Sequence, residues 1–137
     1  MSRFNLVFLG SFFLIISFLS FLNIIYSYYF NLYLNLDTYV YTLIISLIIS
    51  SGLIIKSNQK FKNTIFNKIL VVISGYILLP LVISIPYFLS IYNLTFIDCY
   101  FEAISGFTST GFTVFNNVKN IDESLILWRS SSQWIGG

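Results

Sequence analysis

Residues 95–115 read TFIDCYFEAISGFTSTGFTVF and carry the most informative pattern in the chain. Thr95 followed three residues later by Asp98 is typical of a capping box at the start of a helix. Asp98 and Glu102 would place negative charge in the first turns, where the helix dipole favours it. The sequence therefore predicts a helix that begins directly after Thr95.

The predicted helix is short. It ends at about Ser105, because Gly106 is a natural terminator and residues 108–111 are small, polar and poor helix formers. About ten residues at 1.5 Å each give roughly 15 Å, which is half of a ~30 Å hydrocarbon core. A helix of this length cannot cross a membrane.

Two arrangements fit a half-length helix followed by a polar turn. One is an amphipathic helix on the membrane surface with an exterior loop after it. The other is a re-entrant helix that descends to mid-membrane and returns through residues 108–111, which requires backbone buried in protein or lining a water-filled cavity. In the second arrangement, the negative end of the helix dipole points at mid-membrane, where it can stabilise a cation. The turn adds carbonyl and hydroxyl oxygens as ligands but no carboxylate. This set suits a dehydrated monovalent cation, and Gly111 permits the backbone angles it needs.

The composition places the chain in a membrane. Of its 137 residues, 57% are hydrophobic and 9% are charged, too few to keep the surface of a soluble domain in water. The chain has no histidine and a single cysteine, Cys99, which excludes Ser-His-Asp and Cys-His relays, the common zinc sites and an internal disulfide. We therefore expect no enzyme. A net charge of +2, scattered along the chain, also argues against a nucleic-acid partner.

Uncharged stretches predict three membrane-spanning helices, because a charge at the bilayer centre costs roughly 2.5–3.5 kcal/mol. We expect them at about residues 6–30, 39–55 and 69–89. Pro80 and Pro86 fall within or near the end of the third, where either can kink it. The first stretch is interpreted as a retained helix, because it is too long for a signal core and lacks a small-residue cleavage pattern.

Basic residues indicate the orientation, because cytoplasmic loops gather lysine and arginine. The connector between the second and third predicted spans contains Lys56, Lys60, Lys62 and Lys68. We therefore expect the N-terminus, with Arg3, in the cytoplasm, and the chain just after residue 89 on the outer side. The lysines are interpreted as a topology determinant, or as a patch that also contacts anionic lipid.

Two blocks of sequence resemble a known family. FEAISGFTSTGFTVF at residues 101–115 and LILWRSSSQWIGG at residues 125–137 resemble the first pore unit of the TrkH-type potassium uptake proteins, in the Trk/Ktr/HKT superfamily of cation transporters. The resemblance implies an all-α integral membrane protein with four related units in one polypeptide, each a helix, a re-entrant pore helix with its filter, and a second helix. Residues 1–68 would be two leading transmembrane helices with a basic cytoplasmic loop. Residues 69–137 would be the first pore-forming unit, incomplete.

The resemblance also assigns the filter. It maps onto Ser109, Thr110, Gly111 and Phe112, with Thr108 leading into it, and K⁺ would bind at the first three of these. In this superfamily a filter glycine is associated with potassium preference and a serine with sodium permeation, so Gly111 is the implied selectivity residue. First filters of the TrkH type usually read Thr-Thr-Thr-Gly-Ala. Here Ser109 keeps the carbonyl and a hydroxyl, whereas Phe112 is bulkier than the usual alanine.

The same resemblance implies the pore helix and the partners. The pore helix would carry Asp98, Glu102, Ser105 and Gly106. Potassium would be the transported ion, with no cofactor, and the protein would lie in the plasma membrane, which is the inner membrane of a bacterium. Its partners would be the lipid bilayer, a second transporter subunit and a cytoplasmic nucleotide-binding ring that gates the pore.

Arg129 follows the filter and has two interpretations. Flanked by Trp128 and Trp134, it can be an interfacial arginine whose charged end extends to the membrane surface. The alternative is an electrostatic role in the outer vestibule of the pore.

One pore unit is not a pore. Residues 125–137 are fewer than the ~17 that a span needs, and one filter segment supplies about a quarter of a carbonyl ring. We therefore expect the N-terminal fragment of a TrkH-like transport subunit, one that does not conduct alone. The alternative is a small multi-span membrane interaction protein without transport activity, in which Thr110 and Gly111 are ordinary loop residues.

Overall fold

The computed structural model describes residues 3–56, 65–116, 118 and 121–136, and the regular elements among them are helical. They are α1 (Arg3–Tyr29), the 3-10 turn η1 (Tyr33–Asn35), α2 (Leu36–Ile55), α3 (Ile65–Ile83), α4 (Ile85–Phe88), α5 (Phe96–Phe107) and α6 (Glu123–Gly136). Lys60 and Lys62 of the predicted basic loop lie outside the described residues.

Three segments are long and apolar enough to span a membrane, at Val7–Tyr29, Tyr33–Ile55 and Lys68–Phe88, which confirms the prediction of three spans. The second helix begins earlier than predicted, because Asp37 lies in the first turn of α2. An acidic side chain there is favoured by the helix dipole. Asp37 therefore belongs to the first turn of this helix, whereas the sequence prediction placed Asp37 before the helix.

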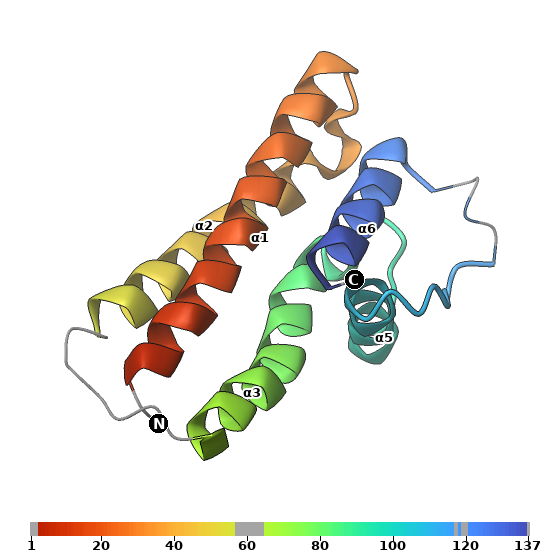
Figure 1. Cartoon of the computed structure of the whole chain (residues 1–137). Helices are drawn as coiled ribbons and strands as arrows, with labels where there is room; N and C mark the ends of the chain where they lie inside the picture. The colour runs from red at the N-terminus through yellow and green to blue at the C-terminus, as the bar shows by residue number, and fades with distance from the viewer. Residues whose placement is uncertain (1–2, 57–64, 117, 119–120, 137) are drawn as a thin grey trace.

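Helices α1 and α2 form an antiparallel hairpin whose turn lies at the opposite end from the N-terminus (Figure 1). Their contact face is polar: α2 buries four small hydroxyl residues spaced four apart, Thr38, Thr42, Ser46 and Ser50. Ser50 Oγ donates to the carbonyl of Gly10 at 2.8 Å, and Ser20 Oγ donates to the carbonyl of Tyr39 at 2.7 Å. Small residues let two membrane helices pack closely and form hydrogen bonds between them. Such contacts stabilise the pair, because moving an apolar side chain from lipid to a helix interface gains little hydrophobic free energy.

The third span is broken at Ser84, between α3 and α4. Pro80 lies inside α3 without ending it, whereas Pro86 lies in the first turn of α4, just after the break. Proline lacks the N–H that would continue the helix, and its ring clashes with the carbonyl four residues earlier. The indole nitrogen of Trp128 on α6 donates to the carbonyl of Ile83 at 3.0 Å, which provides a partner for a backbone group beside the break.

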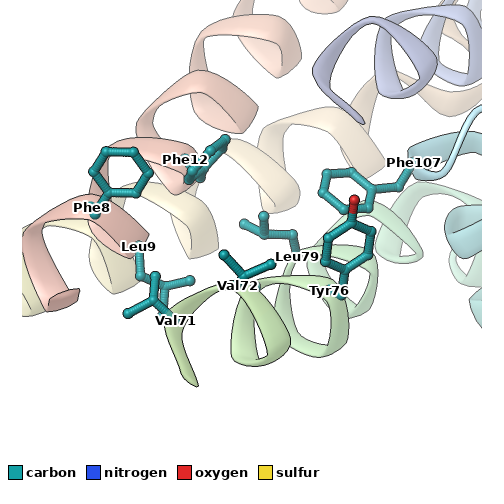
Figure 2. Close-up of a pocket in the computed structure, with 9 residues that line it drawn as sticks. Phe8, Leu9, Phe12, Val71, Val72, Tyr76, Leu79 and Phe107 are labelled. Atoms are coloured by element: carbon teal, nitrogen blue, oxygen red, sulfur yellow. The ribbon is translucent and has the colours of Figure 1, made fainter. Parts of the chain in front are cut away.

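An apolar cavity of about 120 Å³ lies between α1, α3 and the end of α5 (Figure 2). Its walls are Phe8, Leu9, Phe12, Val71, Val72, Gly75, Tyr76, Leu79 and Phe107. Gly75 is one of its lining residues, and a Cβ added there would lie 3.8 Å from the nearest atoms of Leu79 and Leu9, an ordinary contact. The space therefore accepts a methyl group without strain.

We expect Gly75→Ala to raise the thermal midpoint of the protein in detergent micelles. The methyl group fills part of the cavity, and alanine is favoured over glycine in a helix by about 1 kcal/mol. Gly52→Ala in α2 is the matched control, since a Cβ there has no atom within 4 Å and gains only the helix preference. A smaller gain for Gly75→Ala than for Gly52→Ala would contradict the packing argument.

Candidate functional site

Helix α5 begins as the sequence predicts. Thr95 has an extended backbone, its Oγ1 accepts from the backbone N–H of Asp98 at 3.3 Å, and its hydroxyl donates to Asp98 Oδ2 at 2.6 Å. These reciprocal contacts satisfy one of the backbone donors that a helix start leaves open. The cap therefore fixes where α5 starts after the loop that follows α4.

The end of α5 corrects the sequence prediction. The helix continues through Gly106 to Phe107, so Gly106 does not terminate it. A Cβ at position 106 would lie 2.5 Å from Ser132 Oγ on α6, which is closer than real contacts allow. Gly106 therefore serves the close packing of α5 against α6.

Aromatic contacts show how deep α5 runs beside the third span. Near its start, Phe96 contacts Phe88, with ring centroids 6.2 Å apart. At its end, Phe107 contacts Tyr76, near the middle of the span Lys68–Phe88, with centroids 5.4 Å apart. Helix α5 therefore descends along α3 to about half the depth of that span.

The chain then returns to the level from which α5 started. Phe115 contacts Tyr87 and Tyr92, with ring centroids 6.5 Å and 5.9 Å apart, and both tyrosines lie near the C-terminal end of the third span or just beyond it. The segment from Thr110 to Phe115 is not helical. A half-length helix and an extended return thus form a hairpin beside α3.

The turn between them is held by the last carbonyls of α5. The backbone N–H groups of Thr110 and Gly111 donate to the carbonyl of Ser105 at 3.0 Å and 3.4 Å, and Ser105 Oγ donates to the carbonyl of Phe112 at 2.6 Å. Ser109 and Gly111 have positive φ angles, 54° and 83°. Such angles strain a residue that has a Cβ, so the backbone conformation at position 111 favours glycine.

The five residues assigned to the filter lie together and are exposed, whereas Glu102, Ser105 and Gly106 behind them are buried and Asp98 is half-buried. The hydroxyls of Thr108 and Thr110 are 2.7 Å apart, and Ser109 Oγ donates to the carbonyl of Gln133 on α6 at 3.2 Å. Phe112 has 68% of its surface exposed. The turn therefore presents hydroxyl and backbone oxygens on an open face.

Glu102 does not lie at the start of the helix, where the sequence predicted an acidic side chain that interacts with the helix dipole. It lies in the middle of α5, fully buried. Its Oε2 accepts from Thr113 Oγ1 at 3.0 Å and from the backbone N–H of Val114 at 2.9 Å. The carboxylate therefore anchors the returning segment to the helix.

Arg129 directs its charged end towards other groups of the chain. Its Nε forms an ion pair with Glu102 Oε1 at 2.6 Å, and only 16% of its side chain is exposed. Its Nη2 donates to the carbonyls of Gly111 and Phe112 at 3.0 Å and 3.1 Å. One guanidinium thus joins α6, the buried carboxylate of α5 and the predicted filter, and we call Glu102 and Arg129 the filter clamp.

The filter clamp has a simple electrostatic consequence. A guanidinium alone beside the filter would repel a cation, but the buried carboxylate of Glu102 compensates its charge. The carbonyl of Gly111 has a second lone pair, so accepting from Arg129 leaves it able to face an ion, whereas the carbonyl of Phe112 accepts from both Arg129 and Ser105 Oγ. Sequence reasoning missed this pair, although an acid and an arginine flanking a polar turn in so apolar a chain are the residues most in need of partners.

Sequence comparisons relate the chain to cation transporters. An uncharacterized cation transporter of Methanocaldococcus jannaschii is 33% identical over 109 residues, covering 78% of this chain and 23% of the relative. The Trk system potassium uptake protein TrkG of Escherichia coli is 36% identical over 69 residues, covering 50% of this chain and 14% of the relative. TrkI of Halomonas elongata is 36% identical over 67 residues, covering 49% of this chain and 12% of the relative.

The chain spans less than a quarter of the length of each of these relatives. No family model and no solved structure matches the chain.

Proposed function

We propose that this chain supplies one filter-bearing segment of a potassium-conducting pore. The proposal starts from its similarity to the Trk-type potassium uptake proteins. Residues 109–111 contribute oxygen ligands to K⁺, with Thr108 and Phe112 flanking them. A single segment offers about a quarter of the oxygen dipoles that surround an ion in such a pore. Conduction therefore needs further segments of the same kind, and the chain does not conduct by itself.

The observation that supports this proposal is the hairpin of α5 and its return beside α3. Irregular backbone at membrane depth is tolerated only where protein buries it or where it lines a water-filled cavity. The turn reaches the level of Tyr76, and its residues 108–112 are exposed. An exposed polar turn at that depth is explained if it faces a pore, which supports the re-entrant arrangement over a surface helix with an exterior loop.

The proposal includes the orientation and the partners. The start of α1 and the end of α2 lie at the same end of the hairpin, so an N-terminus in the cytoplasm puts Lys56 on the cytoplasmic side as well (Figure 1). The turn of α5 is then reached from the outer side. A second transporter subunit and a cytoplasmic nucleotide-binding ring complete the system that the family resemblance implies.

Cysteine accessibility tests whether the turn is re-entrant. In the complete polypeptide that carries this sequence, with Cys99 replaced by serine, Thr110→Cys is expected to react slowly with a bulky, membrane-impermeant maleimide added from outside. The physical reason is that the turn is shielded at mid-membrane, where a large reagent cannot reach it. A small thiosulfonate cation is expected to react, and K⁺ to slow that reaction.

The matched control is Asn116→Cys in the same background, because Asn116 is exposed on the returning segment beyond Phe115. It should react readily with both reagents. Equal rates for the two cysteines with the bulky maleimide would overturn the re-entrant arrangement and favour a small membrane interaction protein.

A further inference from the structure

The leading hairpin is tied to the pore unit by polar contacts at its turn end. Asn35, at the N-terminus of α2, is 1% exposed, and its Nδ2 donates to Asp122 Oδ2 at 2.9 Å. Asp122 lies directly before α6, and its backbone carbonyl accepts from the N–H of Leu125 at 2.9 Å. Asp122 therefore contacts the first turn of α6 through its backbone carbonyl and the leading hairpin through its carboxylate.

A second set of contacts lies one turn further along α2 and two residues further along the chain at the start of α6. The hydroxyls of Tyr39 and Ser124 are 2.9 Å apart, and both residues are fully buried. Ser124 Oγ also donates to Asp122 Oδ2, so the two sets form one network. The ring of Tyr39 packs against the indole of Trp128, with centroids 5.9 Å apart. We call Asn35, Tyr39, Asp122 and Ser124 the hairpin latch.

The latch acts on the helix that carries Arg129. Ser124 and Arg129 belong to the same helix, α6, within two turns of each other. A helix moves as a rigid rod over that length, so a displacement at the latch displaces the guanidinium as well. The contacts of Arg129 with the carbonyls of Gly111 and Phe112, at 3.0 Å and 3.1 Å, tolerate little displacement before they are lost.

We propose that the leading hairpin is a positioning element for the filter. Through the hairpin latch it sets where α6 begins, and thereby where Arg129 meets the filter carbonyls, so that latch residues far from the ion path influence cation selectivity. This inference rests on the proposed function, and it assigns the α1–α2 hairpin a role beyond anchoring the chain in lipid.

An exchange of the latch pair tests the proposal in the complete polypeptide, reconstituted in liposomes. Asn35→Asp puts a carboxylate against Asp122 and removes the amide donor, so we expect a lower ratio of potassium to sodium permeability. Asp122→Asn alone keeps an acceptor oxygen and should change the ratio less. In the double variant the amide and the carboxylate are exchanged, and the ratio should return towards that of the unaltered protein.

Two controls separate the possible results. Asp37→Asn removes an exposed charge from the same end of the hairpin and should leave the ratio unchanged. A lower thermal midpoint for Asn35→Asp with an unchanged ratio, or no recovery in the double variant, would show a merely structural latch and overturn the inference. If Gly111→Ser changes the ratio while Asn35→Asp does not, the inference alone fails. A polypeptide that moves no potassium overturns both this inference and the proposed function.

Discussion

Glu102→Gln is expected to destabilise the complete polypeptide in detergent by about 3–5 kcal/mol, the usual effect of removing one member of a buried ion pair. Glu102 is fully buried, and its partner Arg129 is 16% exposed. Glutamine keeps hydrogen-bonding atoms for Thr113 and Val114 but leaves the guanidinium charge uncompensated beside the filter. We therefore also expect cation uptake to fall, because that charge repels a cation at residues 109–111. A thermal melt and an ion-flux assay measure the two effects.

Two further variants make this prediction specific to the filter clamp. Asp98→Asn removes a carboxylate from the same helix at its cap, where the charge contributes about 0.3–1 kcal/mol, so it should cost much less. Glu102→Gln combined with Arg129→Met removes both charges and should recover a large part of the lost stability, because no buried charge is left unpaired. Equal losses in the single and double variants would contradict the ion-pair explanation.

The elements that the sequence predicted well depend on local patterns. The three spans follow from uncharged apolar stretches, and the start of α5 follows from Thr95 and Asp98, which lie three residues apart. Each of these signals is complete within a short window. Hydropathy and capping are properties of such windows, so no knowledge of the tertiary fold was needed.

The corrections concern residues whose partners are distant in the sequence. Gly106 carries a helix-stopping signal, but it lies inside the helix, where a Cβ would come 2.5 Å from Ser132 Oγ on α6. Glu102 and Arg129 each have an ordinary local explanation, as a dipole group and an interfacial side chain, and only the fold shows that they pair. The polar face between α1 and α2 was missed for the same reason, because serine and threonine in an apolar stretch do not indicate which helix they contact.

Gly111→Ser is expected to raise sodium permeation relative to potassium, and to destabilise the turn by about 1–2 kcal/mol. The φ angle of Gly111 is 83°, which a residue with a Cβ adopts only with strain. Space is not the obstacle, since a Cβ built there has no atom within 4 Å. The effect must therefore come from the backbone: relieving the strain rotates the carbonyl of Gly111 away from Arg129 and changes the oxygen positions at the filter.

A series at position 111 separates the backbone from the side chain. Gly111→Ala introduces the same Cβ without a hydroxyl, so a backbone origin predicts a change in the permeability ratio close to that of the serine variant. Asparagine tolerates positive φ better than other residues with a Cβ, and Gly111→Asn should therefore perturb the ratio less than alanine despite its larger size. If the changes instead increase with side-chain volume, from alanine to asparagine, the side chain obstructs the ion path and the backbone explanation is wrong. An unchanged ratio in all three variants would remove Gly111 from the filter.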